Sequence, residues 1–352
     1  MASLKSIGYK IIIEEDSFKA LTAFLKQSNY SATFILCDEN TLKHCLPTLI
    51  TQVPKLRQAE IIEIEAGELS KAVEICVMIC QTLIEQRADR NVLLLNLGGG
   101  VVSDLGGFTA SVYKRGISFV HLPTSLLAMA DASVGGKTGI DLNGIKNCIG
   151  TFAQPDGVFI NPSFLNTLPE RHFKNGLAEI IKIALVYDKP FWNRLKKPIS
   201  AKELVEKSVS LKNKIVLKDP YDKGLRNILN FGHTIGHAVE GLLMNSKEPL
   251  LHGEAISIGM IVESHLALQK KLLSRSDYSE VIATLCTLVP AKALHSLSFD
   301  SILSLLTNDK KTSGKKVRFS LITGIGSCKT DVVVSDLQIR KAIDAYHSLT
   351  HV

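Results

Sequence analysis

Three histidines in two neighbouring segments have the residue type and spacing of metal ligands. His233 and His237 lie four residues apart in the run Asn-Phe-Gly-His-Thr-Ile-Gly-His, so on a helix both rings project from one face. His252 follows in Leu-His-Gly-Glu, 19 residues after His233. Burying imidazoles without partners costs free energy, and a bound metal ion would remove that cost. The alternative is that they are core histidines whose rings bond to backbone carbonyls.

An acidic residue in an apolar segment completes a candidate ligand set. Glu179 and Lys182 share one face of the predicted helix Gly176–Leu185, where such a pair can also be a surface stripe or an internal salt bridge. Glu179, one histidine of the first pair and His252 would give one oxygen and two nitrogen ligands. Three protein ligands with one open position are typical of catalytic zinc, whereas structural zinc favours four ligands rich in cysteine. An open metal polarises a hydroxyl or carbonyl oxygen.

Two polar residues before the first histidine, Arg226 and Asn230, continue the helical spacing of the histidine pair. The four residues are separated by steps of four, three and four: Arg226, Asn230, His233 and His237. If the predicted helix Ile228–Leu243 begins early enough, all four line one stripe that can hold metal, carboxylate and hydroxyl groups. Gly232 and Gly236 would keep that helix face bare enough for a ligand.

A glycine run follows an apolar strand in the first half of the chain. The predicted strand Val92–Leu97 leads into Gly98–Gly100 and then towards Asp104. Glycines let backbone N–H groups approach a pyrophosphate, and the N-terminus of the next helix favours negative charge. The spacing differs from G-x-G-x-x-G, and the alternative is a tight turn that needs positive φ.

Acidic and basic residues near other strand ends could bind the rest of a dinucleotide. Asp38 follows a predicted buried strand, where its carboxylate could bind the ribose of NAD and would repel the extra phosphate of NADP. The alternative is a helix N-cap. Glu68 and Lys71 could contact ribose or adenine, or only begin a helix.

Further cations lie beside glycine turns or in apolar surroundings. They are Arg115, Lys137, Lys146, Lys212, Lys310 and Lys311. Several cations around one pocket suit a substrate that carries both phosphate and carboxylate. Lys137 lies in a second glycine-rich segment, 131–139, which lacks the Walker spacing, so ATP hydrolysis is not expected.

The elements that must position these residues predict an α/β chain of two domains, because 352 residues are many for one core. Strands alternate with helices in the first half, which implies a largely parallel sheet covered on both faces. The expected strands are Tyr9–Ile13, Thr33–Cys37, Ile61–Ile64, Val92–Leu97, Phe119–Leu122, Val158–Ile160 and, late in the chain, Val317–Ile322. The expected helices are Ser17–Gln27, Ser70–Gln86, Gly176–Leu185, Ala201–Leu217, Ile228–Leu243, Ala255–Gln269, Asp277–Cys286 and Phe299–Asn308.

We place the domain boundary near Asn161-Pro162-Ser163, where longer helical segments begin. Residues 1–163 are expected to form the NAD-binding α/β domain, and residues 164–352 the helical zinc- and substrate-binding domain.

Composition excludes several classes of protein. The net charge is +7, but the basic residues are scattered and aromatic residues make up only 6%, so a small anionic substrate is expected rather than nucleic acid. The seven cysteines lie mostly in apolar runs and indicate free thiols in a reducing compartment. No run approaches about 18 apolar residues, and the N-terminus lacks a signal core, so a cytoplasmic protein without a membrane anchor is expected.

Together the motifs resemble the 3-dehydroquinate synthase family. They are Gly-Gly-Gly-Val-Val-x-Asp, Val-Gly-Gly-Lys-Thr-Gly, Gly-Leu-Ala-Glu-x-Ile-Lys and Asn-Phe-Gly-His-Thr-x-Gly-His, within residues 98–188 and 212–260. The resemblance implies a Rossmann-like NAD-binding domain, an all-α metal-binding C-terminal domain and a homodimer. It also implies conversion of 3-deoxy-D-arabino-heptulosonate 7-phosphate to 3-dehydroquinate and phosphate, the second step of the shikimate pathway, by a phosphate-eliminating carbon–oxygen lyase.

The resemblance assigns roles residue by residue. The implied ligands of zinc or cobalt are Glu179, His233 and His252. The implied substrate-site and catalytic residues are Arg115 (across the dimer), Asp131, Lys137, Asn147, Lys182, Lys212, Arg226, Asn230, His237 (as a proton relay) and one of Lys310 and Lys311. The implied NAD contacts are Asp38, Asn40, Glu68, Lys71, Gly99, Gly100, Val101, Asp104, Thr124, Ser125, Leu127, Lys137, Lys146, Phe164, Thr167 and Leu168.

The implied reaction uses NAD transiently: oxidation of one hydroxyl, loss of phosphate, re-reduction, then ring opening and aldol closure. One rival is another sugar-phosphate cyclase, which would make an inosose or a valiolone; the intact Asn230, His237 and lysine set favour the shikimate substrate. A second rival is a metal-dependent polyol dehydrogenase of related fold, which would release NADH at each turnover. A third, a sensor or scaffold without activity, is disfavoured by the complete metal triad.

Overall fold

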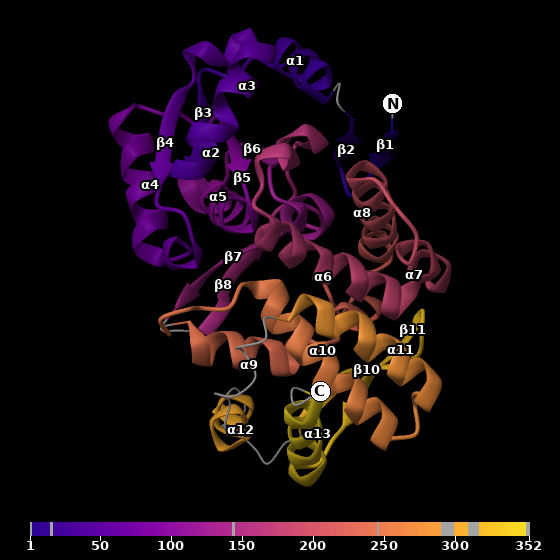
Figure 1. Cartoon of the computed structure of the whole chain (residues 1–352). Helices are drawn as coiled ribbons and strands as arrows, with labels where there is room; N and C mark the ends of the chain where they lie inside the picture. Colours follow the sequence, from indigo (N-terminus) through magenta and orange to yellow (C-terminus); the bar gives the residue numbers. More distant parts are fainter. Residues whose placement is uncertain are drawn as a thin grey trace. The chain divides into compact units, whose positions relative to one another are not determined.

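The computed structural model describes residues 2–14, 17–142, 145–244, 246–289, 299–308 and 317–349 (Figure 1). Over these residues the chain forms two compact units. The first comprises Met1–Phe173 and Ser200–Tyr221, and the second Lys174–Ile199 and Asp222–Val352. Residues 200–221, which the sequence assigned to the second domain, thus belong to the first unit. The predicted boundary after residue 163 stays a prediction.

A seven-stranded sheet, counted over the described residues, forms the centre of the first unit. Its order is β1-β2-β9-β6-β5-β3-β4, and neighbouring strands are parallel except β1 with β2. The strands are β1 (Ala2–Lys5), β2 (Lys10–Ile13), β3 (Thr33–Asp38), β4 (Glu60–Ile64), β5 (Leu93–Gly98), β6 (Ser118–Pro123) and β9 (Gly157–Ile160). The mostly parallel sheet predicted from the sequence is confirmed, and β1 was not foreseen.

Helices cover both faces of this sheet. They are α1 (Ser17–Gln27), α2 (Glu39–His44), α3 (Leu46–Gln52), α4 (Val73–Glu85), α5 (Gly100–Val112) and α8 (Ala201–Lys218). Phe34 and Leu36 of β3 pack in one buried cluster with residues of α4 and α5. Ile35 and Cys37 alternate with them towards the other face and are equally buried. The continuous apolar strands therefore reflect burial on two sides.

Shorter turns and one hairpin complete the first unit. The turns are η1 (Pro54–Gln58), η2 (Glu68–Ser70), η3 (Tyr113–Arg115), η4 (Ala128–Ala132) and η5 (Pro162–Thr167). The hairpin pairs β7 (Lys137–Leu142) with β8 (Ile145–Phe152), and the sequence did not predict it.

The second unit is built around α10. Its helices are α6 (Glu170–Tyr187, whose first turn lies in the first unit), α7 (Lys189–Leu195), α9 (His233–Leu243), α10 (His252–Gln269), α11 (Arg275–Leu285), α12 (Phe299–Asn308) and α13 (Asp336–Leu349), with turns η6 (Leu225–Asn230) and η7 (Cys286–Leu288). Helix α10 packs against α9, α11 and α13. A hairpin of β10 (Arg318–Gly324) and β11 (Ser327–Val333) corrects the expectation of an all-α second domain.

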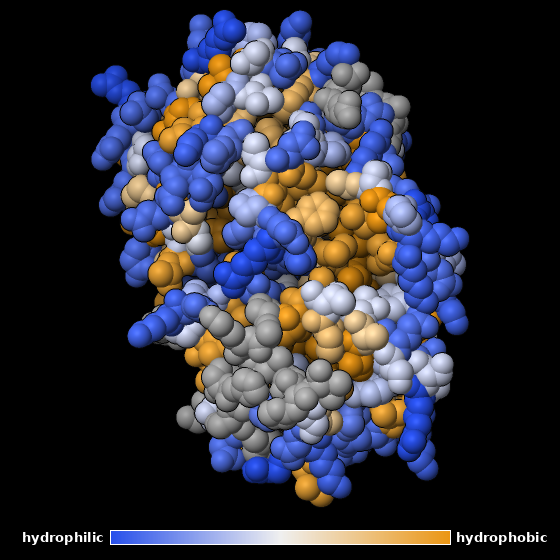
Figure 2. Space-filling model, in the orientation of Figure 1, coloured by the Kyte–Doolittle hydropathy of each residue, from blue (hydrophilic) through white to orange (hydrophobic). Residues whose placement is uncertain are grey.

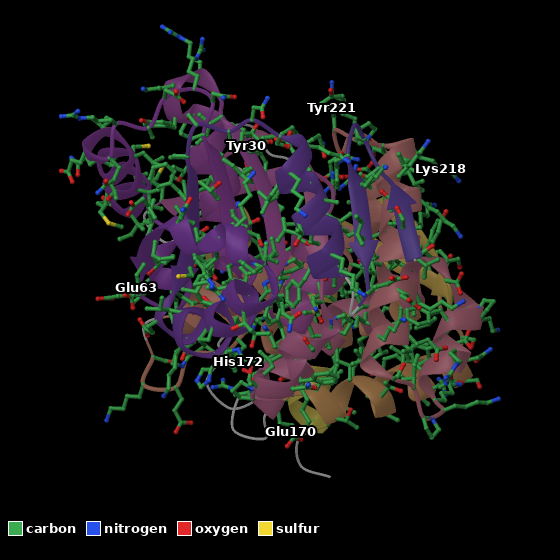
Figure 3. The ribbon with its side chains drawn as sticks, turned by 90° about the horizontal axis from the view of Figure 1, so that it is seen from above. Tyr30, Glu63, Glu170, His172, Lys218 and Tyr221 are labelled. Carbon is green, nitrogen blue, oxygen red and sulfur yellow. The ribbon has the colours of Figure 1, made fainter. Side chains whose placement is uncertain are left out.

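On the face drawn in Figure 2, hydrophobic residues reach the surface and gather near the middle of the view, with hydrophilic residues around them. In Figure 3, Glu63 points outward from the edge strand β4, where a charge disfavours pairing with a strand of another chain. Across the described part of the chain, every helix is too short or too polar to span a membrane.

A buried histidine in the sheet should make stability depend on pH. His121 of β6 lies 3.3 Å from Asn96 of β5, from Nδ1 to Nδ2, and burial lowers the His121 pKa to about 3. A depressed folded-state pKa gives stability that is present above the unfolded value of about 6.5 and lost as pH falls towards 3. We expect His121→Asn to remove a slope of up to about 1.4 kcal/mol per pH unit between pH 6 and 4.

Urea unfolding across this pH range measures the slope. His44→Asn, at an exposed site in the same unit, serves as the matched control. An unchanged slope in His121→Asn would show that His121 is not held neutral in the folded chain.

Candidate metal and nucleotide sites

In the second unit, α6, α9 and α10 bring Glu179, His233 and His252 together. Nε2 of His233 lies 3.8 Å from Oε1 of Glu179, and Nε2 of His252 lies 3.6 Å from the same oxygen. The three ligand atoms all lie within 4.8 Å of one another. Ligands around a tetrahedral zinc ion are about 3.4 Å apart. The spacing therefore fits a divalent metal, although it is too long for direct hydrogen bonds.

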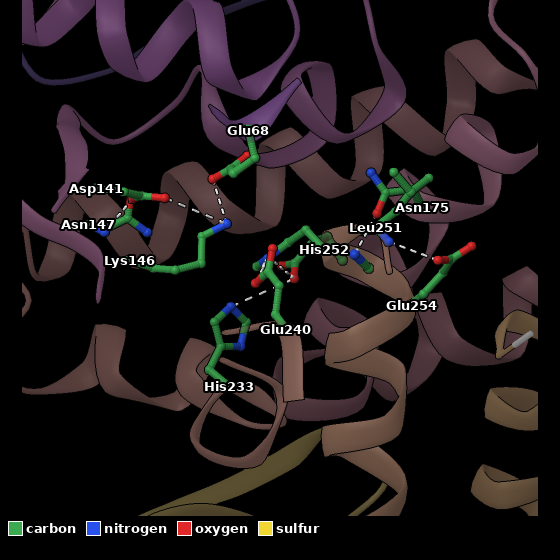
Figure 4. Close-up of polar contacts among 12 residues, drawn as sticks. Glu68, Asp141, Lys146, Asn147, Asn175, His233, Glu240, Leu251, His252 and Glu254 are labelled. Atoms are coloured by element: carbon green, nitrogen blue, oxygen red, sulfur yellow. Dashed lines mark hydrogen bonds and ion pairs between the residues drawn. The ribbon is translucent and has the colours of Figure 1, made fainter. Parts of the chain in front are cut away.

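Each histidine of this triad has its other ring nitrogen engaged. Nδ1 of His233 lies 3.3 Å from the carbonyl oxygen of Phe231, and Nδ1 of His252 lies 3.2 Å from Oε2 of Glu240 (Figure 4). A proton on Nδ1 leaves Nε2 as the metal-binding atom and fixes the ring. Among the described residues, neither oxygen of Glu179 has a hydrogen bond of good geometry, although Lys182 forms an ion pair with it. This donor set fits a metal ion.

The surroundings of the triad favour an ionised Glu179, a protonated His252 and a neutral His233. Burial would raise the pKa of Glu179, but Lys182 and His252 outweigh it and hold the pKa at about 2. Burial likewise would lower the pKa of His252, but Glu240 and Glu179 raise it to about 10. Burial and then Lys182 hold the pKa of His233 well below its usual value. In the protein alone, His252 thus supplies positive charge beside two carboxylates.

His237 lies one turn after His233 and belongs to the same cluster. Its ring centroid lies 5.0 Å from that of His233 and 5.9 Å from that of His252. Glu240, another turn on, forms a second group of possible ligands with His237 and His252. Because Glu240 bonds to Nδ1 of His252, it orients that ring. Sequence reasoning missed Glu240, although its spacing of three residues after His237 places it on the same helix face.

The predicted stripe from Arg226 to His237 is wrong. The helical conformation is interrupted between η6 and α9, where Gly232, the N-cap of α9, has φ 81°. Arg226 is buried in η6, whereas Asn230 is exposed and its Nδ2 donates to Oδ1 of Asn227 at 3.4 Å. Lys310 and Lys311, predicted to reach the substrate, lie outside the described residues.

The glycines of α9 face α10, which corrects the prediction that they leave room for a ligand. A Cβ on Gly236 would lie 2.8 Å from Cδ1 of Ile256, and a Cβ on Gly259 would lie 1.9 Å from the carbonyl oxygen of Gly232. Real Cβ atoms do not approach so closely. The two helices therefore meet backbone to backbone, which fixes His233 against α10.

In the first unit, the glycine run joins β5 to α5. Gly99 is the N-cap of α5 with φ −76°, and the described glycines with positive φ do not include Gly98–Gly100, so the tight-turn alternative is wrong. A Cβ on Gly98 would lie 2.5 Å from the Val102 side chain. Gly98 therefore allows the close approach of strand and helix, and α5 begins without a side-chain cap among the described residues. Such an N-terminus favours an anion.

Beside this helix, Lys71 and Lys146 lie in a network of acidic and amide side chains. Nζ of Lys71 lies 2.6 Å from Oδ2 of Asp104 and also donates to Oδ1 of Asn147. Nζ of Lys146 lies 2.5 Å from Oε1 of Glu68 (Figure 4). Burial raises the pKa of Asp104, although Lys71 opposes it. Five predicted residues from separate segments are thus brought together.

Asp141 is a member of this network that sequence reasoning missed. Its Oδ1 accepts from the backbone N–H of Asn147 at 2.7 Å, and Asn147 has φ 52°. Asp141 therefore holds Asn147 in a conformation that L-residues rarely adopt. An acid within a strand gave no signal in the sequence that could have found it.

Asp131 and Lys212 form a second cluster in the first unit. Nζ of Lys212 lies 2.7 Å from both the carbonyl oxygen and Oδ1 of Asp131. Lys137 begins strand β7 instead of a helix, which agrees with the exclusion of a Walker loop. Oδ1 of Asp38 accepts from the backbone N–H of Thr41 at 2.8 Å and caps α2. Asp38 is therefore a helix N-cap, which was the alternative interpretation from the sequence, and its hydrogen bond to a ribose stays a prediction.

The remaining predicted contacts are dispersed over the first unit. Asn40 is exposed in α2, and Arg115 is exposed with φ 66° in η3. Phe164 is buried against Phe18 at 5.6 Å between ring centroids. The others lie at helix starts or turns beside the sheet: Gly100, Val101, Thr124, Ser125, Leu127, Thr167 and Leu168. Their roles stay predictions.

Comparison with known proteins identifies the relatives of this chain. Sequence models described as 3-dehydroquinate synthase N-terminal and C-terminal match residues 61–175 and 176–312. The 3-dehydroquinate synthase of Parabacteroides distasonis is 37% identical over 344 residues, covering 96% of this chain and 97% of that protein.

Two solved structures resemble the whole chain. The 2-epi-5-epi-valiolone synthase of Streptomyces hygroscopicus subsp. jinggangensis, with NAD+ and Zn2+ bound, is 27% identical with a TM-score of 0.83, and 99% of each chain is covered. A 2-deoxy-scyllo-inosose synthase, complexed with carbaglucose-6-phosphate, NAD+ and Co2+, has a TM-score of 0.83 at 23% identity, covering 97% of this chain and 99% of that one. Fold and site thus define a chain of the sugar-phosphate cyclase class. Within this class, the chain belongs to the 3-dehydroquinate synthase family.

Proposed function

We propose that this chain converts 3-deoxy-D-arabino-heptulosonate 7-phosphate to 3-dehydroquinate and phosphate, as a carbon–oxygen lyase that uses NAD and a divalent metal. The observation that carries the proposal is the triad of Glu179, His233 and His252, with both Nδ1 atoms engaged and both Nε2 atoms facing one oxygen. The family relationship supplies the reaction. NAD+ and Zn2+ in the related valiolone synthase support the cofactors.

The side chains around the triad suit this chemistry. A metal ion held by Glu179, His233 and His252 would polarise a substrate hydroxyl and lower its pKa. His237, beside two of the ligands, is placed to accept that proton and return it. Lys182, buried and paired with Glu179, contributes fixed positive charge.

The first unit supplies the dinucleotide contacts. The uncapped start of α5 suits a pyrophosphate, and Asp38 at the end of β3 suits a ribose. Lys71 and Lys146 are held by Asp104 and Glu68, so their ammonium groups are ordered before a ligand binds. With NAD held in this way, one substrate hydroxyl can be oxidised to a ketone, and that ketone can later be reduced while the cofactor stays bound.

The remaining assignments are parts of the same proposal. They are the other substrate and NAD residues named above, the division into domains 1–163 and 164–352, a homodimer to which Arg115 contributes, and a cytoplasmic location. The family resemblance implies each of them. Light scattering of the purified chain measures the oligomeric state, and a monomer would contradict the role of Arg115.

Phosphate release tests the proposed reaction. The purified chain is incubated with the heptulosonate phosphate, a trace of NAD and either Zn2+ or Co2+. We expect one phosphate per dehydroquinate and no net change at the NADH absorbance band, because the hydride returns to the product. A polyol dehydrogenase would accumulate NADH. Absence of phosphate release in the presence of metal and NAD would contradict the proposal.

A further inference from the structure

Helix α9 has no capping side chain of its own among the described residues. It begins at His233, and its N-cap is Gly232. The first backbone N–H groups of a helix have no partner within that helix. At such a buried end they need acceptors from elsewhere, because an unpaired buried N–H group is costly.

The missing acceptor comes from the middle of α10. Oε2 of Glu263 accepts from the backbone N–H of Gly232 at 2.6 Å, and Oε1 accepts from that of Ile235 at 3.1 Å. The two oxygens of one carboxylate therefore bind the N–H groups on either side of His233. Glu263 is the cap of α9, supplied by another helix.

The location of Glu263 indicates a specific role for its carboxylate. Its side chain is fully buried, between Val262 and the equally buried Ser264. Burial raises the pKa of Glu263 to about 8, although the N–H groups of Gly232, Ile235 and Thr234 oppose the shift. Burying a carboxyl group costs free energy. Its hydrogen bonds to the backbone N–H groups at the start of α9, which an apolar side chain could not make, offset that cost.

A similar contact occurs where α10 begins. His252 is the first residue of α10, and Oδ1 of Asn175 on α6 accepts from the backbone N–H of Gly253. Glu179, the third candidate ligand, lies one turn after Asn175 on that same helix. Side chains thus bind α6 to the start of α10, and α10 to the start of α9. Each histidine ligand begins a helix whose N-terminus is capped by another helix of the triad.

We propose that Glu263 is a positioning residue for the metal site: by capping α9 from α10, it holds His233 in its metal-binding position before metal is present. The inference rests on the proposed triad of Glu179, His233 and His252. Order that exists before binding need not be created during binding, and so it increases affinity. Loss of Glu263 should weaken metal binding although Glu263 does not touch the metal.

Metal affinity of the metal-free, full-length chain tests this role. Zn2+ and Co2+ are each titrated in competition with a chromogenic chelator. We expect Glu263→Ala to raise the dissociation constant about 10- to 100-fold, the range for residues that orient metal ligands. Glu263→Gln keeps one acceptor oxygen and should fall between Glu263→Ala and the unaltered chain. Ser264→Ala, at the next and equally buried position, is the matched control and should leave the affinity unchanged.

Thermal unfolding with and without metal separates positioning from stability alone. If Glu263 only stabilises the fold, its variants will unfold at lower temperature by the same amount in both states, with unchanged metal affinity, and the inference is overturned. If it positions His233, the stabilisation gained on adding metal will shrink. Should Glu263→Ala not fold, Glu263→Gln decides. An unaltered chain that binds no metal would instead refute the proposed triad.

Discussion

His252→Ala is expected to remove the bound metal and to lower kcat/KM by about 1,000-fold or more, which corresponds to about 4 kcal/mol of transition-state stabilisation. His252 offers one of the three candidate ligand atoms, together with Glu179 and His233, and alanine cannot replace it. Two remaining ligands do not hold a divalent ion tightly. Metal content after gel filtration, and the rate of phosphate release, measure the two effects.

The contacts of His252 also define the controls. His265→Ala removes another histidine from α10, one whose Nδ1 lies 3.2 Å from the hydroxyl of Tyr278, and it should keep metal and activity. NAD binding should survive in His252→Ala, because Lys71 and Asp104 belong to the other compact unit. Metal retained by His252→Ala would mean that the triad is misassigned. Loss of NAD binding in the same variant would mean that the metal-binding and NAD-binding residues are assigned to the wrong units.

Lys71→Met should lower the unfolding free energy by about 3–5 kcal/mol, because it leaves carboxylates without their buried cation. Lys71 is only 4% exposed and pairs with Asp104 at 2.6 Å and Glu68 at 4.0 Å. We also expect NAD affinity to fall about tenfold or more, since a charged hydrogen-bond donor is lost. Urea unfolding and isothermal titration with NAD measure these effects.

A double substitution separates charge from ligand binding. In the double variant Lys71→Met with Asp104→Asn, the unpaired carboxylate of Asp104 is also removed. Most of the unfolding free energy should therefore return, while the affinity for NAD stays low. Lys55→Met is a suitable control, because Lys55 bonds to the backbone oxygen of Leu25 rather than to a carboxylate. A double variant as unstable as Lys71→Met would show that packing, rather than charge, governs this position.

The central strands could be predicted from the sequence because their local pattern and final environment agree. Leu93–Gly98 is buried at every position, so its run of four leucines, interrupted only by Asn96, predicts a strand directly. The hairpin of β7 and β8 could not, because most of β8 is exposed or partly exposed and carries polar residues without strict alternation. Its pairing depends on a tertiary setting that no short window contains.

The candidate metal site was predictable in part for a similar reason. Glu179, His233 and His252 have ligand types at suggestive spacing, and the resemblance to the family separated His233 from His237. The interruption of the helix before α9 was not predictable, because it depends on a tertiary contact. Gly232 adopts φ 81°, and its carbonyl oxygen packs against Gly259 of α10. Glu263 was overlooked, although an acid amid the apolar residues of α10 was a usable signal.

The position of helix α8 in the sequence affects how the first unit folds during synthesis. It belongs to the first unit, where Asn213 donates to the backbone oxygen of Lys5, 208 residues earlier, and Lys212 holds Asp131. A ribosome adds about 5–20 residues per second, so strand β1 waits roughly 10–40 s for this partner. Residues 174–199, which belong to the second unit, emerge during that interval. The N-terminal unit is therefore not a fragment that folds first and alone: its completion during synthesis depends on chain that is still to come.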